Sequence, residues 1–443
     1  MLFKLYQILR ICYYPFFVWI FPLFSSSLRK RLAFENRNKG DLLCRSFKQD
    51  RRRADVAFEI SSEGELEQIK PVLMESLNSK MLVELVFSSE SVERACVALA
   101  RERAENLRIL RMPLLGYFPG SAWRDPVAWL SAPKLCLCRY DFFPELMSYG
   151  SRREVEFILL AGSLKSYEKS EKNLFAKSYY QKIYQNFDKI IASTELDQSR
   201  FKEKFGLSAK TVRAFDFRPQ SIDARLQARE GTLRHKFPQY DKFEAMLRPF
   251  AKRRRIVFGS FWERELKAFH SKGADPKTNF ICLVPHKLDR GNIDKIKAGL
   301  QSLDPGAPVY EWSSNQRENQ AVFESFQKNP GVVVLNLKGV LCELYASFGA
   351  AFVGGGHGIS VHSLMEPFLA ECLVYCGPKI HRSTEYDLIR ENNPDRLRIV
   401  DRLENVFEYF KQDEDQELSS LNEFREFYIN QGKPVLDWLG LNK

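Results

Sequence analysis

Short apolar runs alternate with amphipathic segments along most of the chain from residue 54 onward. The apolar runs predict strands, and segments between them, such as 64–77, 91–103 and 175–185, have the apolar spacing of helices. Strands that alternate with helices are typical of parallel β–α–β units, so the predicted fold class is α/β, with open sheets covered on both faces. Such sheets bind ligands at the carboxyl ends of their strands. The predicted strands are 56–60, 82–87, 107–114, 134–139, 155–160, 190–192, 211–214, 256–261, 280–284, 309–312, 332–337, 350–353, 373–376 and 397–400.

The alternation is interrupted at residues 218–250, which contain three prolines, many charges and no sustained apolar period. This segment is predicted to be a linker between two Rossmann-like halves that enclose a cleft. The final helices, near 402–411 and 420–430, are expected to pack back across both halves. The predicted domains are an anchor with a basic flank at 1–40, an N-terminal Rossmann-like domain at 41–235 and a C-terminal one at 236–443.

The N-terminal stretch is the most hydrophobic part of the chain. Residues 11–24 carry no charge and are crowded with aromatic side chains. They are short for a bilayer span of ~20 residues, but 5–28 reaches that length if Arg10 extends to the interface. We expect a membrane anchor, with Arg29-Lys30-Arg31 and Arg51-Arg52-Arg53 meeting anionic headgroups on the cytoplasmic face. A cleaved signal peptide, which lacks a clear cleavage site here, and a buried core helix are the alternatives.

The distribution of charge and of cysteines argues against several classes of protein and site. The net charge is +11, but residues 1–53 hold twelve Lys/Arg against three Asp/Glu, so most of the excess lies beside the hydrophobic stretch. This distribution argues against a nucleic-acid surface. The nine cysteines are scattered through apolar runs without framework spacing, which favours reduced, buried thiols over disulfides or a zinc site. No Asp-x-Asp pair stands at a predicted strand end, so a bound divalent metal is not implied. No cofactor is predicted.

Two predicted strands are followed by polar residues that could take part in catalysis or in anion binding. Glu65 lies in the first turn of the helix after the strand 56–60, where a carboxylate can accept a proton from a hydroxyl nucleophile. The alternative is an acid that only complements the helix dipole. After the strand 280–284, Lys287 and Arg290 suit a phosphate or a carboxylate, unless this is an ordinary solvated loop.

The stretch 352–367 reads as strand, glycine turn and helix start. Glycines allow close approach of a ligand to the backbone, and a helix N-terminus favours an anion, so a phosphate is expected here. Glu366, near that helix start, is a candidate partner for a sugar hydroxyl. The alternative is a tight turn that uses glycine only for its shape. Residues 336–341 form a third polar strand end that opens a helix.

The order of these pieces resembles the 3-deoxy-D-manno-octulosonic acid (Kdo) transferases of bacterial lipopolysaccharide synthesis. Their Ser-x-Gly-Glu motif is similar to Ser62-Glu63-Gly64-Glu65, and their Glu-Thr-Glu-Leu-Trp-Pro segment resembles 139–144, with Asp141 retained as an acid and Arg139 in place of the first Glu. Their Val-Pro-Arg-His-Pro-Glu-Arg loop resembles 284–290, where His286-Lys287 replaces Arg-His.

Two further motifs of that family resemble segments of the second half. The Gly-Glu-Leu-x-x-x-Tyr motif is similar to 339–345, without the Glu after the glycine. The Val-Gly-Gly…Gly-Gly-His-Asn-Pro-Leu-Glu-Pro motif resembles 353–367, which keeps Gly354, Gly355, His362 and Glu366 but has Ser363 in place of Asn. Ser360 and Val361 replace the second glycine pair.

The resemblance implies a membrane-associated enzyme with two Rossmann-like domains in the GT-B arrangement. It implies transfer of Kdo from CMP-Kdo to a lipid A precursor with inversion, at the cytoplasmic face of the bacterial inner membrane, without nucleic acid. Glu65 would be the catalytic base, with Ser62 and Asp141 at the acceptor. The donor-binding residues would be Lys287, Arg290, Gly354, Gly355, His362, Ser363 and Glu366. A GT-B enzyme for another nucleotide sugar and a catalytically inactive membrane-bound paralogue are the alternatives.

Overall fold

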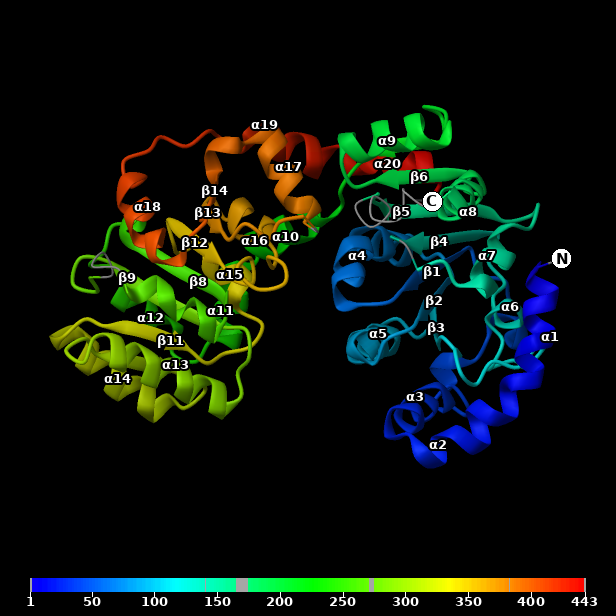
Figure 1. The fold of residues 1–443 in the computed structure, drawn as a ribbon, viewed down its shortest axis with the longest axis horizontal. Helices are drawn as coiled ribbons and strands as arrows, with labels where there is room; N and C mark the ends of the chain where they lie inside the picture. Colours follow the sequence, from blue (N-terminus) through cyan, green and yellow to red (C-terminus); the bar gives the residue numbers. More distant parts are fainter. Residues whose placement is uncertain (1, 140, 165–173, 271–274, 382, 442–443) are drawn as a thin grey trace. The chain divides into compact units, whose positions relative to one another are not determined.

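The computed structural model describes residues 2–139, 141–164, 174–270, 275–381 and 383–441. The chain forms two compact units. The first unit contains residues 1–218 and 430–443, and the second contains 219–429 (Figure 1). The predicted class of two α/β domains is confirmed, because each unit is built on a parallel seven-stranded sheet.

The sheet of the first unit has the strand order β3-β2-β1-β4-β5-β6-β7. The chain moves outward from β1 to β3 and then returns to add β4 on the other side of β1, so β1 and β4 are neighbours at the switch point. Polar residues that follow these two strands therefore meet at one edge of the sheet. The strands are β1 Val56–Ile60, β2 Val83–Phe87, β3 Leu107–Arg111, β4 Lys134–Cys138, β5 Glu156–Gly162, β6 Lys189–Ala192 and β7 Val212–Ala214.

Helices cover this sheet and begin where the sequence supplies caps. The side chain of Ser62 accepts from the Glu65 N–H at the start of α4, and Thr194 does the same for Asp197 at the start of α9. Gly206, with φ +67°, ends α9. The helices of this unit after the N-terminal segment are α4 Glu63–Asn78, α5 Glu90–Glu102, α6 Pro126–Trp129, α7 Pro144–Gly150, α8 Leu174–Gln185, α9 Glu195–Phe205 and α20 Gly432–Leu439.

The sheet of the second unit has the order β10-β11-β9-β8-β12-β13-β14. Its switch point lies between β8 and β12, which pair in parallel from Ile256 with Ala350 to Gly259 with Val353. The strands are β8 Arg255–Phe261, β9 Phe280–Pro285, β10 Val309–Trp312, β11 Val332–Leu335, β12 Ala350–Val353, β13 Leu373–Cys376 and β14 Leu397–Ile399. The helices after β8 are the 3₁₀ segment η6 Glu263–His270, then α13 Arg290–Leu303, α14 Gln316–Lys328, α15 Leu341–Tyr345, α16 Met365–Leu369, α17 Thr384–Asn392, α18 Val406–Gln412 and α19 Asn422–Arg425.

The predicted linker is folded structure. Residues 219–250 belong to the second unit and contain three short helices, α10 Arg218–Gln227, α11 Arg229–Lys236 and α12 Tyr240–Leu247. Each helix has only a few apolar anchors, such as Leu233 and Phe243, and these are buried. The anchors are too few to produce a sustained period, so the sequence pattern concealed these helices. The boundary between the two units therefore lies between residues 218 and 219, not between 235 and 236.

The end of the chain returns to the first unit. Helix α20 places Trp438 beneath the cations of Lys189 and Arg213, which lie 5.4 and 4.5 Å from its ring centroid. Lys134 Nζ donates to the Leu439 carbonyl over 3.1 Å. The helices α18 and α19 stay with the second unit. The closing helices thus divide between the two units.

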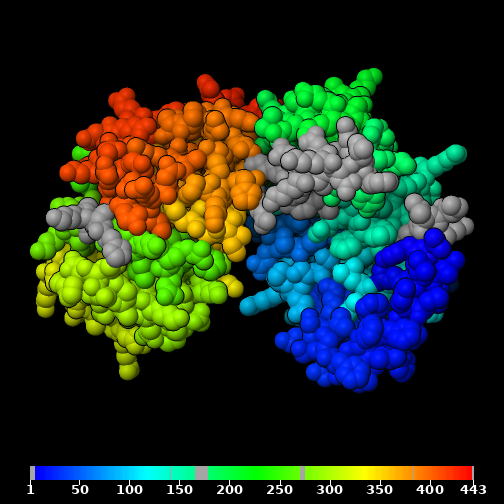
Figure 2. Space-filling model, viewed as in Figure 1, coloured from blue at the N-terminus to red at the C-terminus, as the bar shows by residue number. Residues whose placement is uncertain are grey.

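The predicted anchor is also part of the first unit. It contains α1 Leu2–Pro15, a π-helical turn Phe16–Ile20, α2 Phe21–Phe24 and α3 Ser26–Asn36. The π-turn follows Pro15, whose missing N–H breaks the regular helical bonding. The space-filling view shows this segment, in dark blue, on the surface of the first unit (Figure 2). Among the described residues, one helix, Leu5–Phe24, is long and apolar enough to cross a membrane, with mean hydropathy 1.3 and 6% of the window buried.

Candidate active site

Glu65 lies at the carboxyl end of β1, in the first turn of α4. Its Oε2 accepts a hydrogen bond from the Ser61 N–H over 2.5 Å, and its own N–H donates to Ser62 Oγ over 3.3 Å. This reciprocal pattern resembles a capping box and fixes the carboxyl in place. Only 6% of Glu65 is exposed. Burial raises the pKa of Glu65 to about 7, against the opposing effect of the hydrogen bond from Ser61.

A second acid, Glu59, lies on β1 directly beside this site. It is fully buried, and Ser61 Oγ donates to its Oε1 over 3.1 Å. Burial, together with nearby Glu65 and Asp141, holds the pKa of Glu59 well above its ordinary value. The sequence analysis missed Glu59, although an acid inside the apolar strand Val56–Ile60 was a visible signal.

The residues after β4 complete the acid cluster. Asp141 lies close enough to raise the pKa of Glu65, and the cation of Arg139 acts in the opposite direction. Arg139 adopts a left-handed backbone with φ +61°, and its Nε donates to Gln68 Oε1 of α4 over 2.7 Å. The structure thus brings Glu65 and Asp141 together across the β1–β4 switch point. Tyr140, in the same motif, lies outside the described residues.

The glycine turn in the second unit follows β12. The Gly354 N–H donates to the Gly259 carbonyl over 2.9 Å, and a side chain at Gly354 would strike the Ser260 carbonyl. Gly355 has φ +90°, a conformation that favours glycine. Glycine is therefore required at both positions for packing and backbone shape.

The expected anion cradle already holds a carboxylate of the chain itself. Glu265 is fully buried and accepts from the Gly355 N–H over 2.7 Å and from the Trp262 N–H over 2.9 Å. Burial raises the pKa of Glu265 to about 7. The helix after the turn begins only at Met365, and the Leu364 and Met365 N–H groups donate to Glu385 over 2.6 and 3.0 Å. The backbone N–H groups of the glycine turn and those at the start of α16 are thus already bonded to the carboxylates of Glu265 and Glu385.

Three rings stack beside this turn. Trp262 follows β8, which carries a register shift between Phe258 and Phe261. Its ring lies 4.4 Å from that of His286 and 6.1 Å from that of His362, with interplanar angles of 20° and 11°. Trp262 Nε1 also donates to His362 Nε2 over 3.1 Å. Sequence reasoning named His362 but not Trp262.

The hydrogen bond from Trp262 defines the state of His362. An imidazole nitrogen that accepts a bond carries no proton, so His362 is neutral with its proton on Nδ1. Burial lowers the pKa of His362 to about 4, and neighbouring His286 adds to this effect. His362 therefore offers a neutral ring face rather than a positive charge at neutral pH.

The two predicted cations have different surroundings. Arg290 at the start of α13 pairs with Glu311 over 3.0 Å and with Asp294 over 2.8 Å. Lys287 is exposed, and its Nζ lies 5.8 Å from the ring centroid of Trp262. No ion pair involves Lys287 within the described part of the chain. A bound anion would meet Lys287 directly but would have to compete with two carboxylates for Arg290.

Glu366 belongs to a partly buried charge cluster. Arg225 of α10 donates to Glu366 Oε1 over 3.3 Å and to both oxygens of Glu343 over 3.0 and 3.2 Å. Glu343 lies three residues, or nearly one helical turn, after Val340, the position where the resemblance led us to expect a glutamate. Ser363 is partly exposed just before α16. The sequence analysis missed Arg225 because it lies in the segment assigned to the linker.

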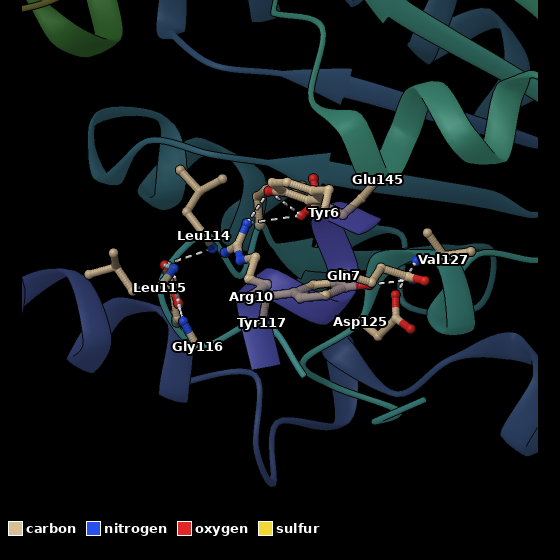
Figure 3. A network of polar contacts seen from close by, with 12 residues as sticks. Tyr6, Gln7, Arg10, Leu114, Leu115, Gly116, Tyr117, Asp125, Val127 and Glu145 are labelled. Atoms are coloured by element: carbon tan, nitrogen blue, oxygen red, sulfur yellow. Dashed lines mark hydrogen bonds and ion pairs between the residues drawn. The ribbon is translucent and has the colours of Figure 1, made fainter. Parts of the chain in front are cut away.

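The N-terminal helix meets the first unit through polar side chains. Tyr6 and Arg10 both donate to Glu145 of α7 over 3.0 Å, and Gln7 donates to the Tyr117 hydroxyl over 2.9 Å (Figure 3). Large apolar side chains of the same segment are exposed, among them Leu5, Ile8, Leu9, Phe16, Trp19, Leu23 and Phe24. One side of the helix thus contacts the protein, and another side exposes apolar side chains to solvent.

The next helix, α3, is attached equally firmly. Glu35 accepts backbone bonds from Leu114, Leu115 and Gly116, at 2.9, 3.0 and 2.6 Å respectively, and pairs with Arg31 over 2.7 Å. Arg31 therefore faces the protein, whereas Arg29 and Lys30 of the same basic triplet are exposed.

Within the described residues, no group of three or more His, Cys, Asp or Glu side chains is arranged to hold a metal ion. All nine cysteines are free, and all but Cys12 are buried. The buried cysteines include Cys138, whose thiol lies next to the acid cluster. Burial holds the pKa of the Cys138 thiol well above its ordinary value.

Comparisons with known proteins bear on this arrangement. Residues 26–216 match the family model of the 3-deoxy-D-manno-octulosonic-acid transferases (kdotransferases). The 3-deoxy-D-manno-octulosonic acid transferase of Chlamydia trachomatis serovar D is 24% identical over 307 residues, which cover 67% of this chain and 62% of that relative. Over these regions the chain is similar to the Kdo transferases. The family match includes Ser62, Glu65 and Asp141.

Solved structures also resemble this chain in fold. The UDP-GlcNAc 2-epimerase of Neisseria meningitidis bound to UDP-GlcNAc has a TM-score of 0.55 at 9% identity and covers 88% of this chain and 100% of that chain. The UDP-GlcNAc 2-epimerase of Methanocaldococcus jannaschii has a TM-score of 0.52 at 9% identity, over 87% and 99%. At this identity the likeness concerns the fold alone, and it agrees with the predicted GT-B class.

Proposed function

We propose that this protein is an inverting glycosyltransferase that moves Kdo from CMP-Kdo to a lipid A-type acceptor. The observation that carries the proposal is Glu65, a buried carboxyl at the β1–β4 switch point whose pKa burial raises to about 7. A base with that pKa is ionised in part at neutral pH and can still hold a proton once it has accepted one. The family match over 26–216 supports the choice of Kdo as the transferred sugar.

The proposed reaction follows from this geometry. Glu65 accepts the proton of an acceptor hydroxyl, and the hydroxyl oxygen attacks the anomeric carbon of Kdo. The bond from that carbon to the phosphate oxygen breaks, and CMP leaves with the electron pair as a phosphate monoester. Ser62 and Asp141 are proposed to orient the acceptor. Glu59 lies beside the base on β1, and burial holds its pKa well above its ordinary value, which favours its neutral form.

The donor is proposed to bind at the β8–β12 switch point of the second unit. Lys287 supplies an uncompensated positive charge for the CMP phosphate, and the Trp262, His286 and His362 rings supply flat surfaces for a pyrimidine. Gly354 and Gly355 shape the turn, and Ser363 lies at its rim as a further donor-binding residue. Glu366, oriented by Arg225, is proposed to bind donor hydroxyls. Arg290 is the weakest member of the predicted set because two carboxylates already hold it.

The membrane association is proposed to be monotopic, on the cytoplasmic face of the inner membrane. A spanning helix would carry Tyr6, Gln7 and Arg10 into lipid and would break their bonds to Glu145 and Tyr117. A helix lying on the first unit keeps those bonds and offers its exposed apolar stripe to the bilayer interface. The polar contacts of α1 therefore favour an embedded surface helix over a single span.

Surface substitutions test this placement better than deletion, because deletion would also uncover Glu145 and Tyr117. Replacing exposed Trp19, Leu23 and Phe24 by serine is expected to move the protein from the membrane fraction toward the soluble one. The thermal midpoint of the soluble unit should stay unchanged. A variant that fractionates as the parent does would contradict the interfacial role.

The reaction is tested by transfer of labelled Kdo from CMP-Kdo to a lipid A precursor. Glu65→Gln keeps an amide oxygen that can accept from the Ser61 N–H, so the helix start is preserved while the base is lost. We expect the rate to fall by about 10³-fold. Glu67→Gln is the matched control, because Glu67 lies on the same helix and its ion pair among the described residues is a solvent-accessible one with Lys70. Equal activity of Glu65→Gln and the parent would refute the base, and binding of CMP by the parent without any transfer would favour an inactive paralogue.

A further inference from the structure

A basic hollow lies in the first unit, away from the acid cluster. It has a volume of about 280 Å³ and is lined by Lys48, Arg52, Arg53 and Arg152, with Glu154 as the one acid in its lining. Leu130, Tyr149 and Val155 form apolar surface between these charges. Four cations around one small hollow concentrate positive potential there.

Three of these cations lack an acidic partner in the described ranges. Arg53 Nε donates to the Ser131 carbonyl over 3.0 Å, and Lys48 Nζ donates to the Ala128 carbonyl over 2.8 Å. The Arg152 guanidinium lies 4.8 Å from the ring centroid of Tyr149. Carbonyls and a ring orient these groups, and none of the three forms an ion pair with an acid of the described residues. Within the described residues, Arg52 is the one of the four that forms an ion pair, with Asp50 at 3.4 Å.

The polar groups beneath the hollow are already bonded to one another. The Tyr149 hydroxyl donates to the Ala132 carbonyl over 2.8 Å, and Ser131 Oγ donates to Glu84 over 2.7 Å. Burial raises the pKa of Glu84 to about 7, so this buried acid carries only part of a charge at neutral pH. A ligand would therefore be recognised by the cations that line the hollow rather than by these buried polar groups.

The hollow is separate from the proposed active site. Arg53 precedes β1, and Arg152 and Val155 precede β5, so the hollow lies at the amino ends of these strands. Glu65 follows the carboxyl end of β1. At ~3.3 Å per residue, the five residues of β1 separate the two ends by roughly 15 Å. A ligand in the hollow does not touch the reacting groups.

We propose that this hollow binds a phosphate-bearing anion. Arg53 and Arg152 can each donate two parallel bonds to phosphate oxygens, and Lys48 adds a point charge. The volume suits one or two phosphate groups better than a whole nucleotide sugar. The phosphate belongs either to a soluble anion or to a lipid headgroup. The inference does not depend on the proposed transfer reaction.

The test uses the full chain in detergent and compares two double variants. Arg53→Gln with Arg152→Gln removes two charges from the hollow. Arg94→Gln with Arg101→Gln removes the same charge from the exposed face of α5 in the same unit and is the control. Calorimetric titration with inorganic pyrophosphate and co-sedimentation with phosphatidylglycerol vesicles, against neutral phosphatidylcholine vesicles, are the two measurements.

We expect the hollow variant to bind one of the probes at least about tenfold more weakly than the control variant. Loss of pyrophosphate binding assigns the site to a soluble anion. Loss confined to phosphatidylglycerol vesicles assigns it to a headgroup. If the two double variants behave alike with both probes, the proposal is overturned. If Arg53→Gln disturbs folding through its bond to Ser131, Lys48→Gln with Arg152→Gln provides the same test.

Discussion

The two switch points occupy the same place in their sheets but carry opposite chemistry. In the first unit, β1 and β4 end in buried acids, and Glu59 and Glu65 both have raised pKa values because burial disfavours their charged forms. In the second unit, β8 and β12 end in glycines and neutral rings, with the exposed cation of Lys287 beside them. The first arrangement can move a proton, and the second can hold a flat, negatively charged group.

The comparison also shows how each unit uses its backbone donors. At Glu65 the Ser61 N–H holds the carboxyl of the proposed base itself in position. At the glycine turn, the N–H groups of Gly355 and Trp262 hold Glu265, which is buried and away from solvent. The turn is therefore a rigid support for Trp262 and His362 rather than an open phosphate cradle. Strand-end topology marks both sites, but side-chain contacts decide what each can bind.

The largest expected effect is on the stability of the second unit. Arg225→Leu leaves Glu343, which is 3% exposed, with an uncompensated charge beside Glu366. We expect the free energy of unfolding to fall by about 2–3 kcal/mol, somewhat less than for a fully buried pair. Urea denaturation measures this change. Arg248→Gln, which breaks an exposed pair with Glu244, is the control and should change stability by less than about 0.5 kcal/mol.

The ring stack is tested by Trp262→Ala and Trp262→Phe. Loss of the ring is expected to raise KM for CMP-Kdo about tenfold, since stacking on a base contributes ~1–3 kcal/mol. Phenylalanine keeps a ring but lacks the N–H that bonds His362. In both variants the pKa of His362, measured by NMR titration, should rise from about 4, because the bond from Trp262 favours the neutral form. An unchanged KM in Trp262→Ala would remove the stack from the donor site.

The acid cluster makes a prediction about pH. Glu65 accepts a proton only when ionised, so kcat/KM should rise with pH up to about 7 and then level off. Asp141 raises the pKa of Glu65, so Asp141→Asn should shift this rise to lower pH. Arg139 lowers it, so Arg139→Gln should shift the rise to higher pH. Each substitution is expected to move the midpoint of this rise by about half to one pH unit. Shifts of the same sign in both variants would contradict the electrostatic account.

The smallest expected effect separates the two predicted cations. Lys287→Gln should raise KM for CMP-Kdo about fivefold, because a charge-assisted contact to phosphate is lost. Arg290→Gln should change KM by less than about twofold, since Glu311 and Asp294 already hold Arg290. Steady-state kinetics at two salt concentrations measures both, with the Lys287 effect decreasing as salt increases. The reverse order would mean that the donor displaces the carboxylates from Arg290.

Much of the fold was predictable because its strands are short apolar runs with polar boundaries. Glu65 was predictable for the same reason, since the Ser62 cap and the preceding strand fix its place locally. The helices of residues 219–250 were not, because they rely on a few anchors, such as Phe243, which packs against Phe280 and Trp312 far along the chain. Local pattern identifies an element only when that element carries its own periodicity.

The sequence by itself determined the strand ends, the glycine turn and the position of Glu65, because these depend on neighbouring residues. Only the tertiary structure decided that Arg225 serves Glu343 and Glu366, that Trp262 stacks with His286 and His362, and that Glu265 fills the turn. It also decided that the N-terminal helix lies on the first unit through Arg10 and Glu145. These pairings join residues separated by tens to more than a hundred positions, so no local pattern records them.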